Sequence, residues 1–312
     1  MPKPVDIRSN LLRAENGTIT KPGGQRLDVA LVFPNTYFTG MSCLGLHAAY
    51  GWGNALEGVR VERYFADLPG PAETLENRLP LQAVDVLAFS ISYIMDYLHV
   101  VEILSRAAIP LLARDRGPSH PLTLAGGMAV SVNRHPIYDV CDVLVHGAGE
   151  TTLAPLLEAC ARRRDDRPAL LHSLAAIPGI EVTAGAQMAA GLDLGAALPS
   201  GAAHEPRHLS AAEAVLVSNA PEVQPPAPCA INNLEAHPLG SVVLTPNTGF
   251  AGKCLIEISR GCPYHCTFCW AGHNITPYAL RPARSVISIM ESQQDRTRSF
   301  GLIAAAVGAH PE

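Results

Sequence analysis

The sequence predicts an α/β protein whose N-terminal part is a Rossmann-like, doubly wound parallel sheet. Continuously apolar runs of strand length recur between residues 28 and 147, and stretches with helical apolar spacing separate them. Such strands, alternating with helices, are typical of a parallel sheet covered on both faces. After residue 240 the pattern of a strand, a helix and a second strand begins again. We therefore expect two α/β regions in one chain.

The composition is that of a globular chain. Its 312 residues are enough for two domains, and 48% are hydrophobic against 16% charged. The net charge of −5 gives no nucleic-acid signature. The N-terminus lacks the apolar stretch of a secretory signal, and no apolar run has membrane-spanning length. We expect a cytoplasmic protein without membrane or nucleic-acid partners.

Five runs of strand length form the predicted sheet; four are apolar, and residues 59–65 alternate between apolar and charged side chains. The five runs are residues 28–33, 59–65, 85–91, 122–127 and 142–147. Helical spacing of apolar side chains follows the third run over 94–108 and the fifth run over 153–160. The sequence thus predicts a Rossmann-like domain over residues 27–165, preceded by an N-terminal extension over 1–26.

The candidate ligand site lies beyond the carboxyl ends of these strands, where open α/β sheets bind their ligands. Glycines follow the fourth run at Gly126 and Gly127 and the fifth run at Gly147 and Gly149, next to Glu150. Glycine allows a backbone to approach a ligand closely. Because glycine-rich loops are common in doubly wound folds, a nucleotide-type or empty domain is the alternative.

Residues 166–240 differ in composition from the regions on either side. They are rich in Ala, Gly and Pro, with a proline-rich stretch at 221–228. Such a composition predicts a linker or insertion with little core of its own. The second α/β region then occupies residues 241–312.

Three cysteines in the second region have the spacing Cys-x3-Cys-x2-Cys, at Cys262, Cys266 and Cys269. Three thiolates can hold three irons of a 4Fe-4S cluster and leave the fourth iron open to another ligand. The alternative is a zinc site completed by His265 or His273. Zinc sites usually add a distant second Cys pair, and none follows here.

The segment over residues 256–272, Ile-Glu-Ile-Ser-Arg-Gly-Cys-Pro-Tyr-His-Cys-Thr-Phe-Cys-Trp-Ala-Gly, resembles the cluster loop of radical S-adenosylmethionine (radical SAM) enzymes. The resemblance implies that S-adenosylmethionine completes the cluster and is cleaved reductively to a 5′-deoxyadenosyl radical. It also implies that Phe268 lies near the adenine, that a flavodoxin or ferredoxin supplies the electron, and that residues 241–312 begin a partial (β/α) barrel.

Residues 27–165 resemble the cobalamin-binding domain that precedes many radical SAM barrels. The resemblance rests on Gly-Gly after the fourth strand and Gly-x-Gly-Glu after the fifth. The Asp-x-His-x-x-Gly signature of many such domains is absent after the first strand. The resemblance therefore implies cobalamin bound without a protein histidine ligand, or a binding capacity that has been lost. Among the other histidines, His146 is the one to test.

The predicted barrel is incomplete. A barrel unit takes about 30 residues, so only about two units fit after Lys253. We expect a fragment, a frameshifted product or one piece of a split protein. Two functions follow. The first is a cobalamin-linked 4Fe-4S radical SAM enzyme that performs methyl transfer or other radical chemistry on a small-molecule or unknown substrate. The alternative is a truncated, inactive Rossmann-like binding protein.

Overall fold

A computed structural model describes residues 6–24, 26–194 and 225–311. The chain divides into two compact units, which we name the sheet unit and the cysteine-loop unit. The sheet unit comprises Thr20–Tyr37 and Trp52–Cys229. The cysteine-loop unit comprises Met1–Ile19, Phe38–Gly51 and Ala230–Glu312. The predicted extension over residues 1–26 is therefore shared between the two units.

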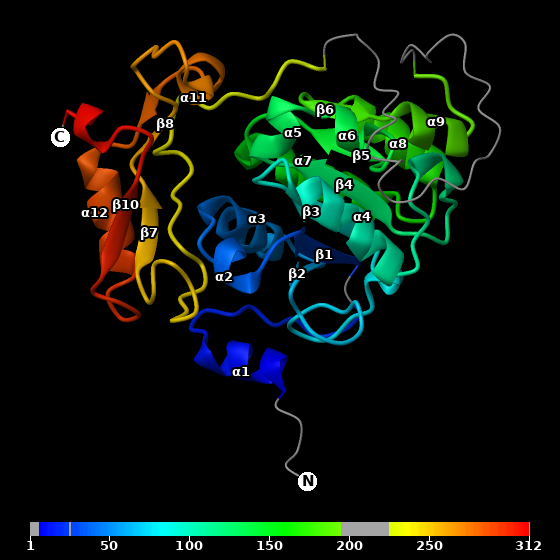
Figure 1. Ribbon diagram of the computed structural model, residues 1–312, viewed down its shortest axis with the longest axis horizontal. Coiled ribbons are helices and arrows are strands. Elements are labelled where there is room, and N and C mark those ends of the chain that lie inside the picture. Colours follow the sequence, from blue (N-terminus) through cyan, green and yellow to red (C-terminus); the bar gives the residue numbers. More distant parts are fainter. Residues whose placement is uncertain (1–5, 25, 195–224, 312) are drawn as a thin grey trace. The chain divides into compact units, whose positions relative to one another are not determined.

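The sheet unit is built on six strands in the order β2-β1-β3-β4-β5-β6 (Figure 1). The first five are parallel, and β6 is antiparallel to β5. Their bounds are β1 (Leu27–Phe33), β2 (Val59–Phe65), β3 (Val86–Ser90), β4 (Leu122–Gly126), β5 (Val143–Val145) and β6 (Ile180–Val182). The predicted α/β class is confirmed, and strands form at all five runs.

Helices cover the sheet on both faces (Figure 1). From β1 the chain crosses to β2 on one side, and from β3 it crosses to β4 on the other. Right-handed crossovers in opposite directions place their helices on opposite faces. The helices and 3-10 turns of the sheet unit in chain order are η1 (Leu81–Ala83), α4 (Asp96–Arg106), η2 (Ala113–Asp115), α5 (Met128–Val132), α6 (His135–Tyr138) and α7 (Gly149–Arg162). Most of α2 (Tyr37–Gly40) and α3 (Leu44–Ala55) belongs to the cysteine-loop unit.

The first part of the predicted linker is folded. Residues 167–189 form α8 (Arg167–Ala175), β6 and α9 (Ala184–Ala189), and they extend the sheet beyond β5. Leu170, Leu171 and Leu174 give α8 a buried apolar face, so this segment contributes to the core. The first half of the proline-rich stretch at 221–228, residues 221–224, lies outside the described residues.

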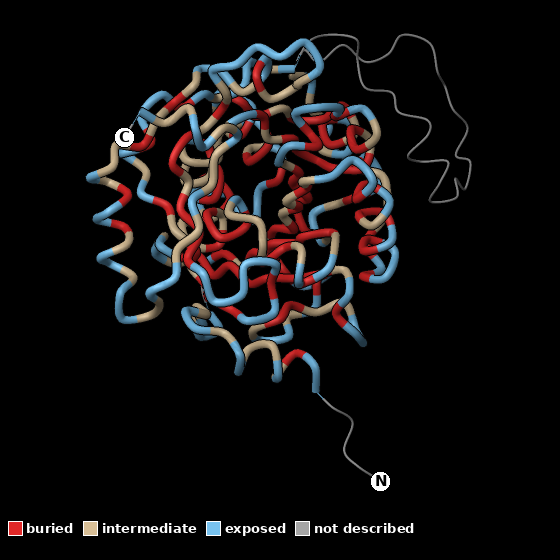
Figure 2. Tube along the Cα trace, turned by 60° about the vertical axis from the view of Figure 1, so that its left-hand side comes forward, coloured by how far each residue is buried: buried red, intermediate tan, exposed pale blue. Residues whose placement is uncertain are grey.

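Burial follows the strands. All residues of β1 except Asp28 are buried, as a strand covered on both faces requires. Figure 2 shows long buried stretches in the interior of the trace and exposed stretches on the outside. The loops that leave the strands are therefore held by a dry, packed interior.

The edge strand β2 is covered by the residues that follow it. All seven of its residues are buried, although three are charged. Glu62 accepts hydrogen bonds of 2.5 Å from the Thr74 hydroxyl and from the Asn77 amide. Arg63 pairs with Glu76 at 2.7 Å. Buried charges of this kind are tolerated because they are paired, and the cover hides an edge that could otherwise pair with another chain.

The cysteine-loop unit contains a second strand–helix–strand motif. β7 (Cys254–Glu257) pairs in parallel with β10 (Phe300–Ile303), and α12 (Ala283–Ser292) connects them. These elements lie where the sequence predicted the start of a barrel. The buried core of this strand–helix–strand motif consists of Leu244, Cys254, Ile256, Ile258, Val286 and Ile289. The unit also contains α1 (Ile7–Ala14), β8 (Ser259–Arg260), α11 (Trp270–Asn274), β9 (Ala279–Leu280) and η3 (Val307–Ala309).

Arg281 joins three backbone segments of this unit. It is fully buried, at 0% exposure. Its guanidinium donates hydrogen bonds to the carbonyl oxygens of Glu257 at 2.7 Å, Leu234 at 2.6 Å and His237 at 3.1 Å. Because Glu257 ends β7, this contact anchors the backbone at the start of the cysteine-bearing segment.

Replacing Arg281 by Met is expected to destabilise the unit by about 3 kcal/mol, because three carbonyl groups lose the hydrogen bonds that this buried guanidinium donates. The measurement is urea unfolding followed by Trp270 fluorescence in a Trp52→Phe background. The matched control is Arg284→Met, because Arg284 pairs with Glu235 at 2.8 Å with its side chain 75% exposed. Equal midpoints for the two variants would contradict the anchoring role of Arg281.

Candidate functional site

The three predicted cluster cysteines lie on a closed loop beyond β7. β8 pairs antiparallel with β9, which brings the two ends of the intervening residues 261–278 together. Figure 1 shows β8 and α11 beyond the tip of β7. The loop therefore projects from the carboxyl end of a parallel strand, which is the usual location of ligand-binding residues in α/β folds.

Two glycines let this loop fold tightly on itself. Gly261 has φ +74°, and a Cβ there would lie 2.3 Å from the Ile275 carbonyl oxygen. A Cβ on Gly272 would lie 2.4 Å from the Tyr264 carbonyl oxygen. Both contacts are with backbone atoms, which cannot move aside as a flexible side chain would. Residues 261–275 thus pack closely because these positions lack side chains.

The loop presents its cysteines toward solvent. Cys262 and Cys269 are partly buried and Cys266 is exposed, all as free thiols. The Cys269 amide donates to the Cys266 carbonyl at 2.9 Å, which brings that pair into one turn. Within the described ranges, no three His, Cys, Asp or Glu side chains converge as a metal-binding group. The ligand role of the three cysteines stays a prediction, and Cys thiolates are the usual ligands of iron–sulfur clusters.

Three of the remaining cysteines are in a different chemical environment. Burial raises the pKa of Cys141 and the pKa of Cys160 to about 12. Burial also raises the pKa of Cys254, which lies on β7. Since the thiolate is the form that binds metals, these buried thiols are poor ligands. Their environment separates them from the cysteines of the loop.

The histidines of the loop are engaged with the loop itself. His273 Nε2 lies 3.0 Å from the Cys266 carbonyl oxygen. The His273 ring also faces the His265 ring, with centroids 5.6 Å apart. A zinc site using His273 Nε2 would have to break the contact with Cys266. Phe268, expected near an adenine, is 90% exposed and leaves a large apolar ring uncovered.

The sheet unit has a second candidate site at the carboxyl ends of β1 and β3. The strand order reverses between these neighbours, because β2 lies on one side of β1 and β4 lies beyond β3. In open α/β sheets the ligand crevice forms at such a switch point. The loops that leave it contain Pro34 to Thr36 after β1 and Ile91 to Met95 after β3.

Large apolar side chains are exposed at this edge. The loop after β3, the first turn of α4 and the helix α5 after β4 supply them. This carboxyl-edge patch consists of Tyr93, Ile94, Met95, Leu98, Met128 and Val132, each between 40% and 71% exposed. Exposed apolar side chains gathered on neighbouring elements mark interaction or ligand-binding surfaces more than isolated ones do.

Polar groups adjoin this patch, and the sequence analysis did not single them out. The Asn35 amide donates to Asp96 Oδ1 at 2.7 Å, and His99 Nδ1 lies 2.8 Å from the Pro34 carbonyl oxygen. Asp96 is only 2% exposed, and burial is the main cause that raises the pKa of its carboxyl group. Among the described residues, Asp96 Oδ2 has no hydrogen-bond partner. The pairing of a loop asparagine with a helix N-terminal aspartate leaves no periodic signal in a sequence.

The first predicted glycine pair has a structural reason. Gly127 has φ +109°, and a Cβ there would lie 2.5 Å from the Ile91 carbonyl oxygen. On Gly126 the nearest atom would be the Val145 Cβ at 3.3 Å. The chain between β4 and α5 therefore passes directly against the loop after β3. Gly127 is required for this crossing whether or not a ligand binds.

In the second predicted glycine pair, Gly147 and Gly149, the first glycine also has a structural reason. Gly147 has φ +91° and pairs as a β-bridge with Cys229, whose backbone nitrogen would lie 2.3 Å from a Cβ. The Ala148 amide donates to the Cys229 carbonyl at 2.7 Å. The backbone expected to face a ligand is thus occupied by another part of the chain. Gly149 begins α7, and Glu150 lies in its first turn.

His146 is buried beside the glycine loop. Its Nε2 lies 2.8 Å from Glu181 Oε2, and Arg134 Nε lies 3.1 Å from the same oxygen. A nitrogen held by a carboxylate is not available to a metal unless that pair separates. The structure therefore favours a structural role for His146 over ligation of cobalt.

Replacing Gly127 by Ala is expected to lower the free energy of unfolding by about 1–3 kcal/mol, because Ala must adopt a left-handed conformation against a carbonyl oxygen. Urea unfolding measures the change. The control is Gly149→Ala, where the nearest atom to the new Cβ lies 4.0 Å away, on Trp52. We expect no loss there, and a Gly127→Ala protein as stable as wild type would contradict the steric argument.

Comparison with known proteins agrees with the loop sequence. Residues 45–182 match the family model described as radical SAM proteins, N-terminal. This part of the chain is thus similar to the N-terminal domain of radical SAM proteins. Among curated proteins none matches. No helix of the described residues is both long and apolar enough to cross a membrane.

A solved structure is similar over most of this chain. It is the radical S-adenosylmethionine methyltransferase TsrM from Kitasatospora setae, with cobalamin and a 4Fe-4S cluster bound. The TM-score is 0.43 at 15% sequence identity, and the match covers 90% of this chain and 48% of that one. The chain thus spans about half the length of the methyltransferase.

Proposed function

We propose that this chain belongs to a radical SAM enzyme in which Cys262, Cys266 and Cys269 bind a 4Fe-4S cluster. The observation that carries the proposal is the three-cysteine loop at the carboxyl end of β7, in a chain whose sheet unit matches the radical SAM N-terminal family. Three cysteines leave one iron for S-adenosylmethionine. When bound, the cluster supplies the electron that cleaves this cofactor, and the protein positions the two.

The loop supports this function through features of its own. Its closed base and two close backbone crossings hold the cysteines on a short, compact segment. Phe268 lies between Cys266 and Cys269 in sequence and is almost fully exposed, so it is free to pack against the adenine. An aromatic ring covered by a flat ligand contributes both apolar burial and stacking. The electron would come from an external donor such as a flavodoxin or ferredoxin.

Anaerobic reconstitution of the full chain with iron and sulfide tests the cluster. We expect about four irons per chain and a reduced electron paramagnetic resonance signal that changes when S-adenosylmethionine is added. Cys269→Ala should lose the signal, because only two loop thiolates remain. The measurements are iron content and the spectrum with and without S-adenosylmethionine.

The matched control is Cys43→Ala, a cysteine of the same unit outside the loop. It should retain the iron and the spectral change. A protein that takes up zinc in place of iron would establish the alternative zinc site. A cluster whose spectrum is indifferent to S-adenosylmethionine would contradict cofactor binding by this chain alone and support the truncated, inactive alternative.

We further propose that the sheet unit binds cobalamin at the carboxyl-edge patch. The patch lies at the β1/β3 switch point, and its exposed apolar side chains suit the flat face of a corrin ring. The buried Asp96 oxygen beside it is an acceptor of the kind that amide side chains of a ligand satisfy. His146 is engaged by Glu181, so the cobalt would bind without a protein histidine ligand. Methyl transfer or another radical reaction would follow on a substrate yet to be identified.

Met95→Glu is expected to weaken hydroxocobalamin binding at least about tenfold, because a charge replaces an exposed apolar contact at the centre of the patch. Equilibrium dialysis with absorption of the retained corrinoid measures binding. The control is Met188→Glu, at a methionine that is 59% exposed, against 71% for Met95. Met188 lies on α9, which follows the antiparallel β6 and so lies toward the other edge of the sheet. Equal losses in both variants, or no binding by wild type, would refute this site.

A further inference from the structure

A cavity of about 400 Å³ lies at the amino ends of the parallel strands, on the edge of the sheet that faces away from the switch point. The first residues of β1, β3 and β4 line it, together with the last turn of α7 and the first turn of α8. Neither the proposed cluster nor the proposed cobalamin site uses any of its residues. Its size is that of pockets that hold small organic molecules.

The inner wall of the cavity is apolar. It is formed by side chains at the starts of the strands and on α8, among them Leu27, Val86, Leu122 and Leu170. All four are at most 5% exposed, so they belong to the packed core. A ligand that reaches this wall would bury an apolar body against the base of the sheet.

The opposite wall carries hydrogen-bond donors. Arg167 and Arg164 line the cavity, and so does His120. His120 Nδ1 accepts a hydrogen bond of 3.1 Å from the Gly117 amide, so in the neutral ring the proton lies on Nε2. The N-terminus of the nine-residue helix α8 also meets the cavity at Arg167 and adds its positive end to this wall.

Arg167 is the residue that points to a ligand. It is nine-tenths buried, with 9% exposure. Its Nη1 donates to the His120 carbonyl at 3.2 Å, and its Nη2 lies 2.9 Å from Asp142 Oδ2 without the alignment of a hydrogen bond. Among the described residues, Nε and Nη2 of Arg167 have no hydrogen-bond partner. A buried donor without an acceptor is costly, so an acceptor from outside the chain would stabilise this arrangement.

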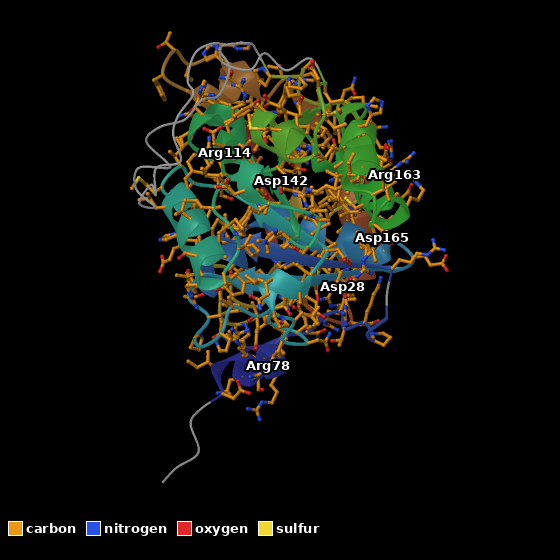
Figure 3. The ribbon with its side chains drawn as sticks, turned by 90° about the vertical axis from the view of Figure 1, so that its right-hand side faces the viewer. Asp28, Arg78, Arg114, Asp142, Arg163 and Asp165 are labelled. Atoms are coloured by element: carbon orange, nitrogen blue, oxygen red, sulfur yellow. The ribbon has the colours of Figure 1, made fainter. Side chains whose placement is uncertain are left out.

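The acidic side chain of the inner rim is already satisfied. Asp85 Oδ1 lies 2.7 Å from Arg164 Nε, and Asp85 Oδ2 accepts a hydrogen bond of 2.7 Å from the Asp28 amide. Asp142, paired with Arg167, also accepts two hydrogen bonds of 2.8 Å from Thr123. Figure 3 shows Asp142 in the interior and Arg163 and Asp165 toward the surface. Asp85 is thus engaged, whereas Asp142 Oδ1 has no hydrogen-bond partner among the described residues. Asp142 does not line the cavity, so the buried unsatisfied groups of the lining itself are the donors of Arg167.

We propose that this cavity binds a small organic anion whose carboxylate or phosphate group contacts Arg164 and Arg167 and whose apolar body packs against Leu122 and Leu170. The anion would accept the hydrogen bonds that Arg167 lacks, and Arg164 would be shared between the anion and Asp85. The site is separate from the radical SAM chemistry proposed above, so either can fail without the other.

Thermal unfolding of the full chain with three probes that share one ring tests this site: phenyl phosphate, benzoate and the neutral benzyl alcohol. At constant ionic strength, we expect one or both anions to raise the melting temperature saturably, since a ligand that binds only the folded state stabilises it. The ratio of the two affinities distinguishes phosphate from carboxylate. Benzyl alcohol should have no such effect.

Arg164→Gln should weaken anion binding about tenfold, the loss expected for one charge-assisted hydrogen bond. The matched control is Arg163→Gln, the exposed neighbour that does not line the cavity, and its affinity should equal that of wild type. Ala83→Trp, at the exposed rim, should block binding sterically without changing a charge. Stabilisation by benzyl alcohol equal to that by the anions, equal losses in the two arginine variants, or no saturable shift up to about 10 mM anion would overturn the proposal.

Discussion

The backbone pairing of β1 with a parallel neighbour on each side is the constraint on which the sheet unit depends. β1 pairs with β2 along its whole length and with β3 from Val29 to Val32, so its polar backbone is satisfied inside an apolar interior. Because these neighbours are parallel, the chain leaves β1, β2 and β3 at the same edge of the sheet. The strand order reverses between β1 and β3, so the loops after these two strands lead away from each other. The apolar side chains after β3 and β4 are exposed next to this switch point.

The cysteine-loop unit follows the same logic with fewer strands. β7 ends at Glu257, and from there the chain must leave the sheet. The Arg281 side chain binds the Glu257 carbonyl, and the Arg281 amide donates to the Ile258 carbonyl. The residue that follows β9 is therefore bonded to the two residues that precede β8. The position of the cysteines thus depends on a side chain that does not belong to their motif. A substitution of Arg281 would therefore change the arrangement of the three cysteines without replacing any of them.

The features that could be predicted from the sequence are those that leave a pattern of residue types or spacing. Buried strands such as β1 and β3 are mostly apolar. For the cysteines, the spacing of Cys262, Cys266 and Cys269 is itself the signal. β6 escaped prediction because it has three residues, and α8 because it lies in an alanine- and proline-rich segment. Gly127 and Gly147 were expected to face a ligand, whereas each meets a distant backbone segment. Arg281 and the Asn35–Asp96 pair could not be predicted, because they depend on which residues the fold brings together.

The cover over β2 has a consequence for synthesis on the ribosome. Thr74, Glu76 and Asn77, which supply its polar contacts, directly follow β2 in the chain, whereas β3 and β4 come later. The outer edge of the nascent sheet can therefore be shielded before the inner strands have emerged. When several ribosomes translate one messenger RNA, their incomplete chains lie close together. The β2 edge of each chain would already be covered, which limits the pairing between chains that exposed strand edges otherwise promote.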